Sequence, residues 1–172
     1  MSASQHGEIE GIVLRLSNAF GAPMDKDVNC WMLLVNDLCR QAAQTRKLLL
    51  HTSGSQQRDF VCLTEVCRVI QQLAVGGEGA SSQGIFNVGA GASQTVLQMA
   101  QLIQRRCVQV FGFEPELQRT AVAPDEQKPE LTFRTNRLAE ANMSASLDST
   151  AEVDSLLQFC LSNFGPSQEQ AT

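Results

Sequence analysis

The chain has 172 residues, of which 43% are hydrophobic, and it carries a formal net charge of −5. This size and apolar content are enough for one domain with its own core, which excludes a disordered tail. The acidic balance, without clustered lysine and arginine, argues against nucleic-acid binding, and no apolar run approaches the roughly 20 residues that cross a membrane.

The amino terminus and the cysteines narrow the class further. The segment "MSASQHGEIEG" (1–11) lacks the basic start and apolar middle of a signal peptide, so we expect a cytoplasmic protein. Six cysteines include no Cys-x-x-Cys pair and are accompanied by only two histidines, so no metal site is predicted. Several cysteines fall on apolar faces, which favours buried reduced thiols over disulfides.

The first half of the chain alternates strand-like and helix-like segments. "GIVLRL" (11–16) is typical of a buried strand, and "SNAFGAP" (17–23) of a loop. Helical spacing of apolar residues predicts a helix over 30–46. "KLLLHT" (47–52) follows as a short strand, "SGSQQ" as a turn and "RDFVCL" (58–63) as an extended segment. Thr64 is expected to cap a helix whose inward face consists of Val66, Val69, Ile70 and Leu73.

The second half continues the alternation. Residues 74–84 are expected to form a surface loop, "IFNVGAGAS" (85–93) a strand and a glycine turn, and 96–112 a helix with a Thr95–Gln98 capping box. The remaining expectations are a strand in "PELQRTAV", a loop in "APDEQKPE", a short helix in "TNRLAEAN" that ends at Asn142, and a helix from a Ser149–Glu152 capping box to Gly165. We predict a single α/β domain over 1–165 and a flexible tail over 166–172.

Most catalytic signatures are missing. In "NVGAG" the pattern Gly-x-Gly follows a strand, but the third glycine of a dinucleotide loop is absent, so a tight turn with positive φ is the favoured interpretation. The P-loop and the Gly-x-Ser-x-Gly elbow are also absent. His6 and His51 lie far apart in the sequence and no pair of carboxylates stands out, so we predict no catalytic residue.

Asn18 and Arg58 are the candidate ligand-binding residues. Asn18 follows a predicted strand at its carboxyl end, where open α/β sheets bind ligands. Arg58 begins an extended segment, and its planar guanidinium suits a bidentate contact with phosphate. Asp59, which follows it, could hold the guanidinium or the backbone turn. The alternative from the residues alone is a local salt bridge that anchors a loop.

Four segments together carry a resemblance to a known family. "GIVLRLSNAFGAP", "KLLLHTSGSQQRDFVCLTEV", "GIFNVGAGAS" and "RTNRLAEA" occur in the order seen in the carboxyl-terminal half of extended short-chain dehydrogenase/reductases, the NAD-dependent epimerases and dehydratases of nucleotide sugars. The most specific piece is 58–66, which resembles the family's Arg-Asp-aromatic-Val-x-Val-x-Asp-Val. The likeness runs from Gly11 to Phe164.

The resemblance implies a fold and a set of roles. The fold would be a partial Rossmann-type sheet, with 11–29 as its strand and loop, plus the small mixed α/β substrate-binding domain. Leu16 and Ser17 would lie near the nicotinamide end of NAD or NADP. Asn18 and Arg58 would contact the diphosphate of a nucleotide sugar, and a third pair, Leu48 and Leu50, would lie along its base.

The chain also departs from the family pattern. The family's Gly-rich NAD loop and Tyr-x-x-x-Lys pair are absent, and the sequence contains no tyrosine. The stretch matching an arginine-bearing phosphate loop reads "PDEQ" (124–127), and Arg134 replaces a usual Asp; both changes weaken the case for tight diphosphate binding.

These features lead to two principal hypotheses. The first is the substrate-binding portion of an NAD-dependent nucleotide-sugar epimerase or dehydratase, inactive alone and without tight cofactor binding. The second is a non-catalytic binding or assembly module that pairs with itself, through an exposed strand at 9–20, or with a separate Rossmann half. An unrelated α/β enzyme is a third option.

Overall fold

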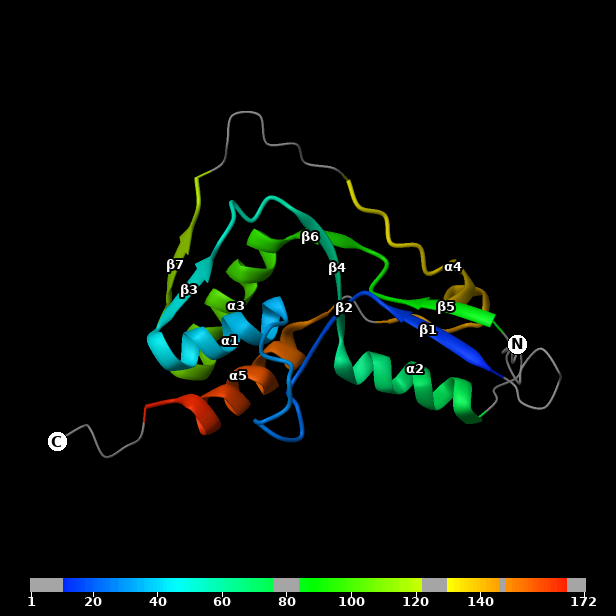
Figure 1. Cartoon of the computed structure of the whole chain (residues 1–172), viewed down its shortest axis with the longest axis horizontal. Helices are drawn as coiled ribbons and strands as arrows, with labels where there is room; N and C mark the ends of the chain where they lie inside the picture. The colour runs from blue at the N-terminus through cyan, green and yellow to red at the C-terminus, as the bar shows by residue number, and fades with distance from the viewer. Residues whose placement is uncertain (1–10, 76–83, 122–129, 146–147, 167–172) are drawn as a thin grey trace.

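The computed structural model describes residues 11–75, 84–121, 130–145 and 148–166, and it confirms the α/β class (Figure 1). The strands are β1 (Ile12–Leu16), β2 (Asn18–Phe20), β3 (Lys47–Leu50), β4 (Gln57–Cys62), β5 (Gly84–Val88), β6 (Ser93–Thr95) and β7 (Glu116–Arg119). The helices are α1 (Leu34–Thr45), α2 (Leu63–Val75), α3 (Val96–Phe111), α4 (Asn136–Glu140) and α5 (Thr150–Phe164). Of the helices in these ranges, none is long and apolar enough to cross a bilayer.

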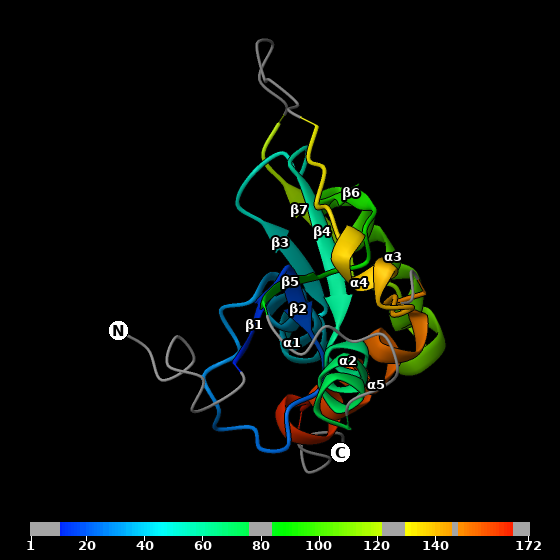
Figure 2. The same ribbon diagram turned by 90° about the vertical axis from the view of Figure 1, so that its right-hand side faces the viewer.

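The strands form three small sheets. β1 pairs in parallel with β5, and β3 pairs in parallel with β7. In the third sheet β4 is central, parallel to β2 and antiparallel to β6. Helices α1, α3 and α5 gather beside β3 and β7, whereas α2 and α4 lie next to β1 and β5 (Figures 1 and 2).

A larger core lies between α1, α3 and α5 and the strands beside them. It contains 19 of the described residues, among them Leu38, Leu48, Ile103 and Leu157. On one side of it, the Arg106 guanidinium makes two hydrogen bonds of 2.7 and 2.6 Å to the Asp154 carboxylate, which join α3 to α5. The larger core therefore fixes the positions of three helices relative to one another.

A smaller core lies between β1, β5, α2 and α4. Its buried members are Val61, Val66, Val69, Leu73, Phe86, Val88, Leu138 and Met143. The prediction that Ile70 belongs to this inward face is wrong, because its side chain is 47% exposed. The helix turns Ile70 away from the core that its neighbour Val69 enters.

The expectation that the first strand is buried is also wrong. Val13 is 53% exposed and Leu16 is 45% exposed. Within the described ranges β1 pairs with β5 alone, and Val13 shares one face of this sheet with Ile85, its partner in the register, which is 40% exposed. Burial of β1 thus depends on a neighbour that these residues do not supply.

Several segment assignments also differ from the prediction, two of them near the candidate site. The segment after β1, expected as a loop, contains β2, which forms because Asn18–Phe20 pairs with Phe60–Cys62 of β4. Helix α1 begins at Leu34 rather than at Cys30 and ends where Arg46 takes a left-handed conformation with φ 57°.

The predicted helix caps have mixed outcomes. The Thr95–Gln98 capping box is confirmed. The Ser149–Glu152 box does not form, because Glu152 accepts a 2.6 Å hydrogen bond from the Thr64 hydroxyl, and the Asp148 carboxylate accepts instead from the Thr150 amide at 2.9 Å. Thr64 is no cap either, since α2 starts at Leu63 directly after β4.

Other predictions about turns, thiols and loops can be compared with the structure as well. Gly165 ends α5, as expected. The expected cap of the short helix is displaced by one residue, because Ala141 is the C-cap of α4 and Asn142, with φ 55°, follows it. All six cysteines are free thiols, and four of them are buried: Cys39, Cys62, Cys107 and Cys160. Most of the predicted loops 74–84 and 123–130, and almost all of the tail 166–172, lie outside the described residues.

Candidate functional site

A cleft of about 390 Å³ opens where β2 and β4 meet the carboxyl end of β3 and the start of α3. Its wall combines apolar side chains from the segment before α1 and from β3 with polar side chains from the strands and the following loop. The lining residues are Asn18, Met32, Leu33, Leu34, Asp37, Leu49, Leu50, His51, Thr52, Gln56, Arg58 and Val96. Two candidate residues, Asn18 and Arg58, therefore share one cavity although 40 positions separate them.

A chain of hydrogen bonds orients Asn18 and Arg58. The pairing of β2 with β4 brings the two residues together, and the Arg58 Nη1 group donates to the Asn18 Oδ1 at 3.4 Å. The Asn18 Nδ2 group in turn donates to the backbone oxygen of Asp59 at 2.9 Å. A guanidinium carries five N–H donors, so this contact leaves most of them available to a ligand in the cleft.

Asp59 serves the backbone rather than its neighbour Arg58. Its side chain is fully buried, and its Oδ1 accepts a 3.0 Å hydrogen bond from the Ala90 amide. Successive residues of a strand point to opposite faces, and among the described residues no ion pair joins Arg58 to Asp59. The alternative of a local salt bridge is therefore wrong, and Asp59 holds the turn after β5.

The glycine turn held by Asp59 is structural. A Cβ on Gly89 would lie 2.5 Å from the Asp59 Oδ1 and 2.6 Å from the Phe133 ring, so glycine alone fits without movement. Gly91 takes φ 72°, which confirms the positive φ expected of this turn. The Oδ2 atom of Asp59 is buried without a hydrogen-bond partner within the described structure.

Strand β3 presents its leucines to two different environments. Leu48 is fully buried and belongs to the larger core, whereas Leu49 is 42% exposed and lines the cleft. Leu50 is 3% exposed and reaches both. Sequence reasoning missed Leu49, although the period of two in a strand, with Leu48 and Leu50 inside, is a signal that identifies it.

Leu16 and Ser17 lie at the carboxyl end of β1, just before Asn18, and neither lines the cleft. The Ser17 amide donates to the Val88 oxygen at 2.9 Å, which continues the β1–β5 pairing. The Ser17 hydroxyl is buried and has no hydrogen-bond partner within the described structure. A buried hydroxyl without a partner is a group that a ligand can satisfy.

The acidic group of the cleft is already neutralised. Asp37 accepts hydrogen bonds from Arg40 at 3.1 Å and from Gln41 at 2.6 Å. Its negative charge is therefore balanced by the guanidinium one turn further along α1. Arg58 is the arginine among the lining residues, and it is exposed. The electrostatics of the cleft thus favour an anionic ligand close to Arg58.

Sequence reasoning also missed several other lining residues. Met32 and Leu33 lie in turns before α1, although the apolar spacing predicts a helix there. His51 and Thr52 lie beyond the end of β3. The sequence contains no local signal for them, since they reach the cleft only because the chain folds back there. No three His, Cys, Asp or Glu side chains gather as metal ligands in the described part of the chain.

Residues 1–89 match the model of the NAD dependent epimerase/dehydratase family. The match covers just over half of the chain, and the chain therefore belongs to this family. The resemblance inferred from the sequence is confirmed.

Curated relatives are longer than this chain. A dTDP-6-deoxy-L-talose 4-dehydrogenase (NAD(P)(+)) from Kitasatospora kifunensis is 28% identical over 133 residues, which are 77% of this chain and 39% of that protein. A dTDP-L-rhamnose 4-epimerase from Burkholderia thailandensis is 30% identical over 92 residues, which are 53% of this chain and 24% of that protein. The chain thus spans well under half the length of these relatives.

Solved structures share the fold at low sequence identity. The structure of RMD from Pseudomonas aeruginosa, complexed with NADPH, superimposes with a TM-score of 0.68 at 17% identity and covers 93% of this chain and 50% of that one. A UDP-N-acetylglucosamine 4-epimerase from Methanobrevibacter ruminantium, in complex with UDP-N-acetylmuramic acid, gives 0.64 at 17% identity and covers 93% and 48%. The expected α/β fold with a partial Rossmann-like sheet is confirmed.

Proposed function

We propose that this chain is the substrate-binding portion of an NAD-dependent nucleotide-sugar epimerase or dehydratase. The observation that carries the proposal is the hydrogen-bonded Asn18–Arg58 pair in the wall of a cleft, in a chain of this family. The relatives named above support the nucleotide-sugar class, because they are described as enzymes of dTDP-sugars.

The cleft offers complementary groups for the two parts of such a ligand. Arg58 binds the diphosphate through its free N–H donors, and Asn18 holds the guanidinium at 3.4 Å in a fixed direction. Leu49 and Leu50 form an apolar wall for the base, and Leu48 supports that strand from the core. The contribution of this chain is orientation of the substrate and neutralisation of its charge.

The cofactor of this family accepts and returns a hydride. Leu16, which is 45% exposed, and Ser17, with its unpartnered hydroxyl, fit a contact with the nicotinamide end. The glycine-rich loop that holds a dinucleotide pyrophosphate is not found in this sequence, and neither is tyrosine. These 172 residues by themselves therefore bind NAD or NADP weakly and transfer no hydride.

Calorimetric titration with UDP-, GDP- and dTDP-sugars tests the cleft. At least one of these ligands binds, and Arg58→Ala weakens its binding by about 10- to 100-fold, because a hydrogen bond to a charged group contributes about 1.5–3 kcal/mol. Arg105→Ala is the matched control, since Arg105 lies on α3 and does not line the cleft. Unchanged affinity in Arg58→Ala would show that the diphosphate contact is wrongly assigned.

A second candidate function is a non-catalytic assembly module. The observation that favours it is the exposure of β1, where Val13 is 53% and Leu16 is 45% exposed on a strand with one described partner. An apolar strand edge of this kind pairs with another chain. Light scattering is then expected to find a homo-oligomer that Val13→Lys shifts toward monomer, and a monodisperse wild-type monomer would refute it.

A further inference from the structure

The methionines of the described residues fall into two groups. Met99 and Met143 are buried, whereas Met24 is fully exposed and Met32 is 89% exposed. Of these four, Met32 is the one that lines the cleft of about 390 Å³. It is also the one sulfur-bearing residue among the described residues that line this cleft. A thioether that solvent can reach therefore forms part of the candidate ligand site.

The backbone on both sides of Met32 is anchored. The Trp31 ring packs edge-on against the Phe164 ring, with 4.8 Å between the ring centres. The Leu33 amide donates a hydrogen bond to the Cys30 oxygen at 3.1 Å. Met32 thus presents its side chain to the cleft from a position that tertiary contacts fix.

Met32 extends the apolar part of the cleft wall. Leu33, which is 48% exposed, and Leu49, which is 42% exposed, line the same cleft. A ligand that fills the cleft removes such apolar surface from water, and this burial stabilises the complex. The unbranched, polarisable side chain of methionine also adapts to the shape of what it contacts. The thioether therefore contributes to binding as an apolar group.

Oxidation of a thioether by hydrogen peroxide removes this apolar character. The sulfur lone pair forms a bond to one peroxide oxygen while the O–O bond breaks, and the other oxygen leaves with both peroxide protons as water. The sulfur loses two electrons and the peroxide gains them. The product is a polar sulfoxide, which methionine sulfoxide reductases convert back to the thioether.

We propose that Met32 is an oxidation site through which hydrogen peroxide weakens ligand binding in the cleft. Its exposure lets peroxide reach the sulfur without any opening of the fold. A sulfoxide oxygen is solvated by water in the free chain and loses that water when a ligand covers the apolar wall, so the free state is favoured. The effect on binding rests on the function proposed above, whereas the oxidation of Met32 does not.

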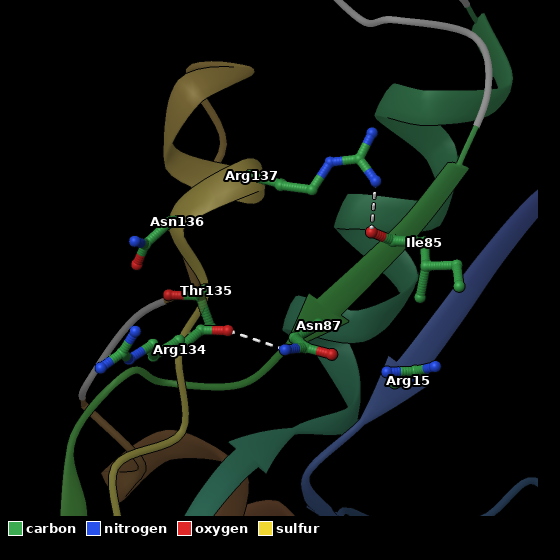
Figure 3. A pocket seen from close by; sticks show the side chains of 7 residues that line it. All are labelled: Arg15, Ile85, Asn87, Arg134, Thr135, Asn136 and Arg137. Atoms are coloured by element: carbon green, nitrogen blue, oxygen red, sulfur yellow. Dashed lines mark hydrogen bonds between the residues drawn. The ribbon is translucent and has the colours of Figure 1, made fainter.

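A second hollow, of about 250 Å³, lies next to β5 and α4 and does not share these features (Figure 3). Its lining carries no sulfur and consists of Arg15, Ile85, Asn87 and residues 134–137. Its arginines do not converge, because Arg134 points away from Arg15 and Arg137 (Figure 3). The Arg137 guanidinium lies 4.9 Å from the centre of the Phe86 ring. Titration with a nucleoside diphosphate is therefore expected to report on the cleft and not on this hollow.

Calorimetric titration before and after peroxide treatment tests the proposal. Cys30→Ser combined with Cys67→Ser removes the two thiols that are not buried. In this background, the tightest-binding ligand among dTDP, UDP and GDP is expected to bind about 3- to 10-fold more weakly after treatment, because part of one apolar contact is lost. Peptide mass spectrometry is expected to find sulfoxide at Met24 and Met32 before it appears at the buried methionines.

Two matched leucine variants locate the effect. Met32→Leu keeps an apolar side chain that peroxide does not oxidise, so its affinity is expected to be the same before and after treatment. Met24→Leu removes the other exposed thioether, which does not line the cleft, and is expected to lose affinity as its parent does. Methionine sulfoxide reductases of the A and B types are expected to restore the affinity of the treated parent.

The possible outcomes separate this inference from the proposed function. Unchanged binding after treatment, with sulfoxide found at Met32, would overturn the inference and leave the proposed function intact. An equal loss of affinity in Met32→Leu, or a Met32 that peroxide leaves unoxidised, would overturn the inference as well. If none of the three nucleotides binds before treatment, the proposed function is refuted, and the regulation of its cleft is refuted with it.

Discussion

The two cores of the molecule differ in the number of residues that they bury and in how completely the elements around them are covered. The larger core brings 19 described residues between α1, α3 and α5, whereas the smaller core brings eight between α2, α4 and the β1–β5 sheet. The cleft with Asn18 and Arg58 borders the larger core through Leu50, whereas Arg137 of α4 lies over the Phe86 ring of the smaller core.

The two regions suit different roles because one is closely packed and the other leaves a strand exposed. A cleft that must hold a ligand in one orientation needs walls that do not move, and close packing around β3 supplies them. Strand β1, in contrast, leaves Val13 and Leu16 exposed. The region of the smaller core is therefore where we expect this chain to meet further structure, whether a second copy or a Rossmann half.

A pair of matched leucine truncations gives the largest expected difference between the cores. Leu157 in the larger core and Leu138 in the smaller core are both fully buried. Leu157→Ala is expected to lower the free energy of unfolding by about 2–5 kcal/mol, because the surrounding helices cannot collapse into the cavity. Leu138→Ala is expected to lower it by less, because α4 has only five residues and can shift. Urea unfolding measures both, and equal losses would contradict the ranking.

A smaller effect is expected at the turn between β5 and β6, where the two regions join. Gly89→Ala places a Cβ within 2.5 Å of the Asp59 carboxylate and 2.6 Å of the Phe133 ring, so we expect a loss of about 1–3 kcal/mol from overpacking. A double-mutant cycle with Phe133→Ala locates the clash. Strictly additive losses would show that the crowding has another source.

The smallest expected effect is a loss of stability at alkaline pH that begins in the larger core. Burial raises the pKa of the Cys107 thiol and of the Cys160 thiol to about 12, and it also raises the pKa of Cys39. Above about pH 8.5 the unfolded chain loses thiol protons that the folded chain retains. The free energy of unfolding is therefore undiminished below that pH and falls as the pH rises toward about 12.

Urea unfolding at about pH 7.5 and about pH 9 measures this loss of stability. Cys160→Ala is expected to reduce the difference between the two pH values, because it removes one raised pKa. Cys67→Ser is the control, since Cys67 is exposed on α2 and is expected to leave the difference unchanged. If Cys67→Ser changed the pH dependence and Cys160→Ala did not, the buried thiols would not be the cause of the loss of stability.

Local features of the sequence predicted much of the fold. The Thr95–Gln98 capping box formed because both partners lie within one turn of the same helix. The Ser149–Glu152 pair has the same spacing but forms no capping box, because the Glu152 carboxylate accepts a hydrogen bond from Thr64, which is 88 residues away. A cap therefore follows from the sequence only where no distant side chain competes for it.

The candidate site shows the same division. Arg58 and Asn18 could be identified from their positions beside predicted strands, and the structure places both in one cleft. For Asp59 the sequence left two roles open, contact with the guanidinium or with a backbone turn, and it could not choose between them because the partner Ala90 lies 31 positions later in the chain. Leu49, His51 and Thr52 enter the cleft through the path of the backbone after β3 and not through any motif.

The sequence by itself determined most of the order of strands and helices, the class of fold, and two of the polar residues of the cleft, Asn18 and Arg58. These follow from periodicity, from capping residues and from family motifs, all of which act within short stretches of chain. Only the tertiary structure decided that β1 is exposed, that Asp59 holds a turn, and that Arg15, Arg134 and Arg137 line one hollow. Such features depend on contacts between segments that are far apart in the sequence, and local sequence patterns do not specify these contacts.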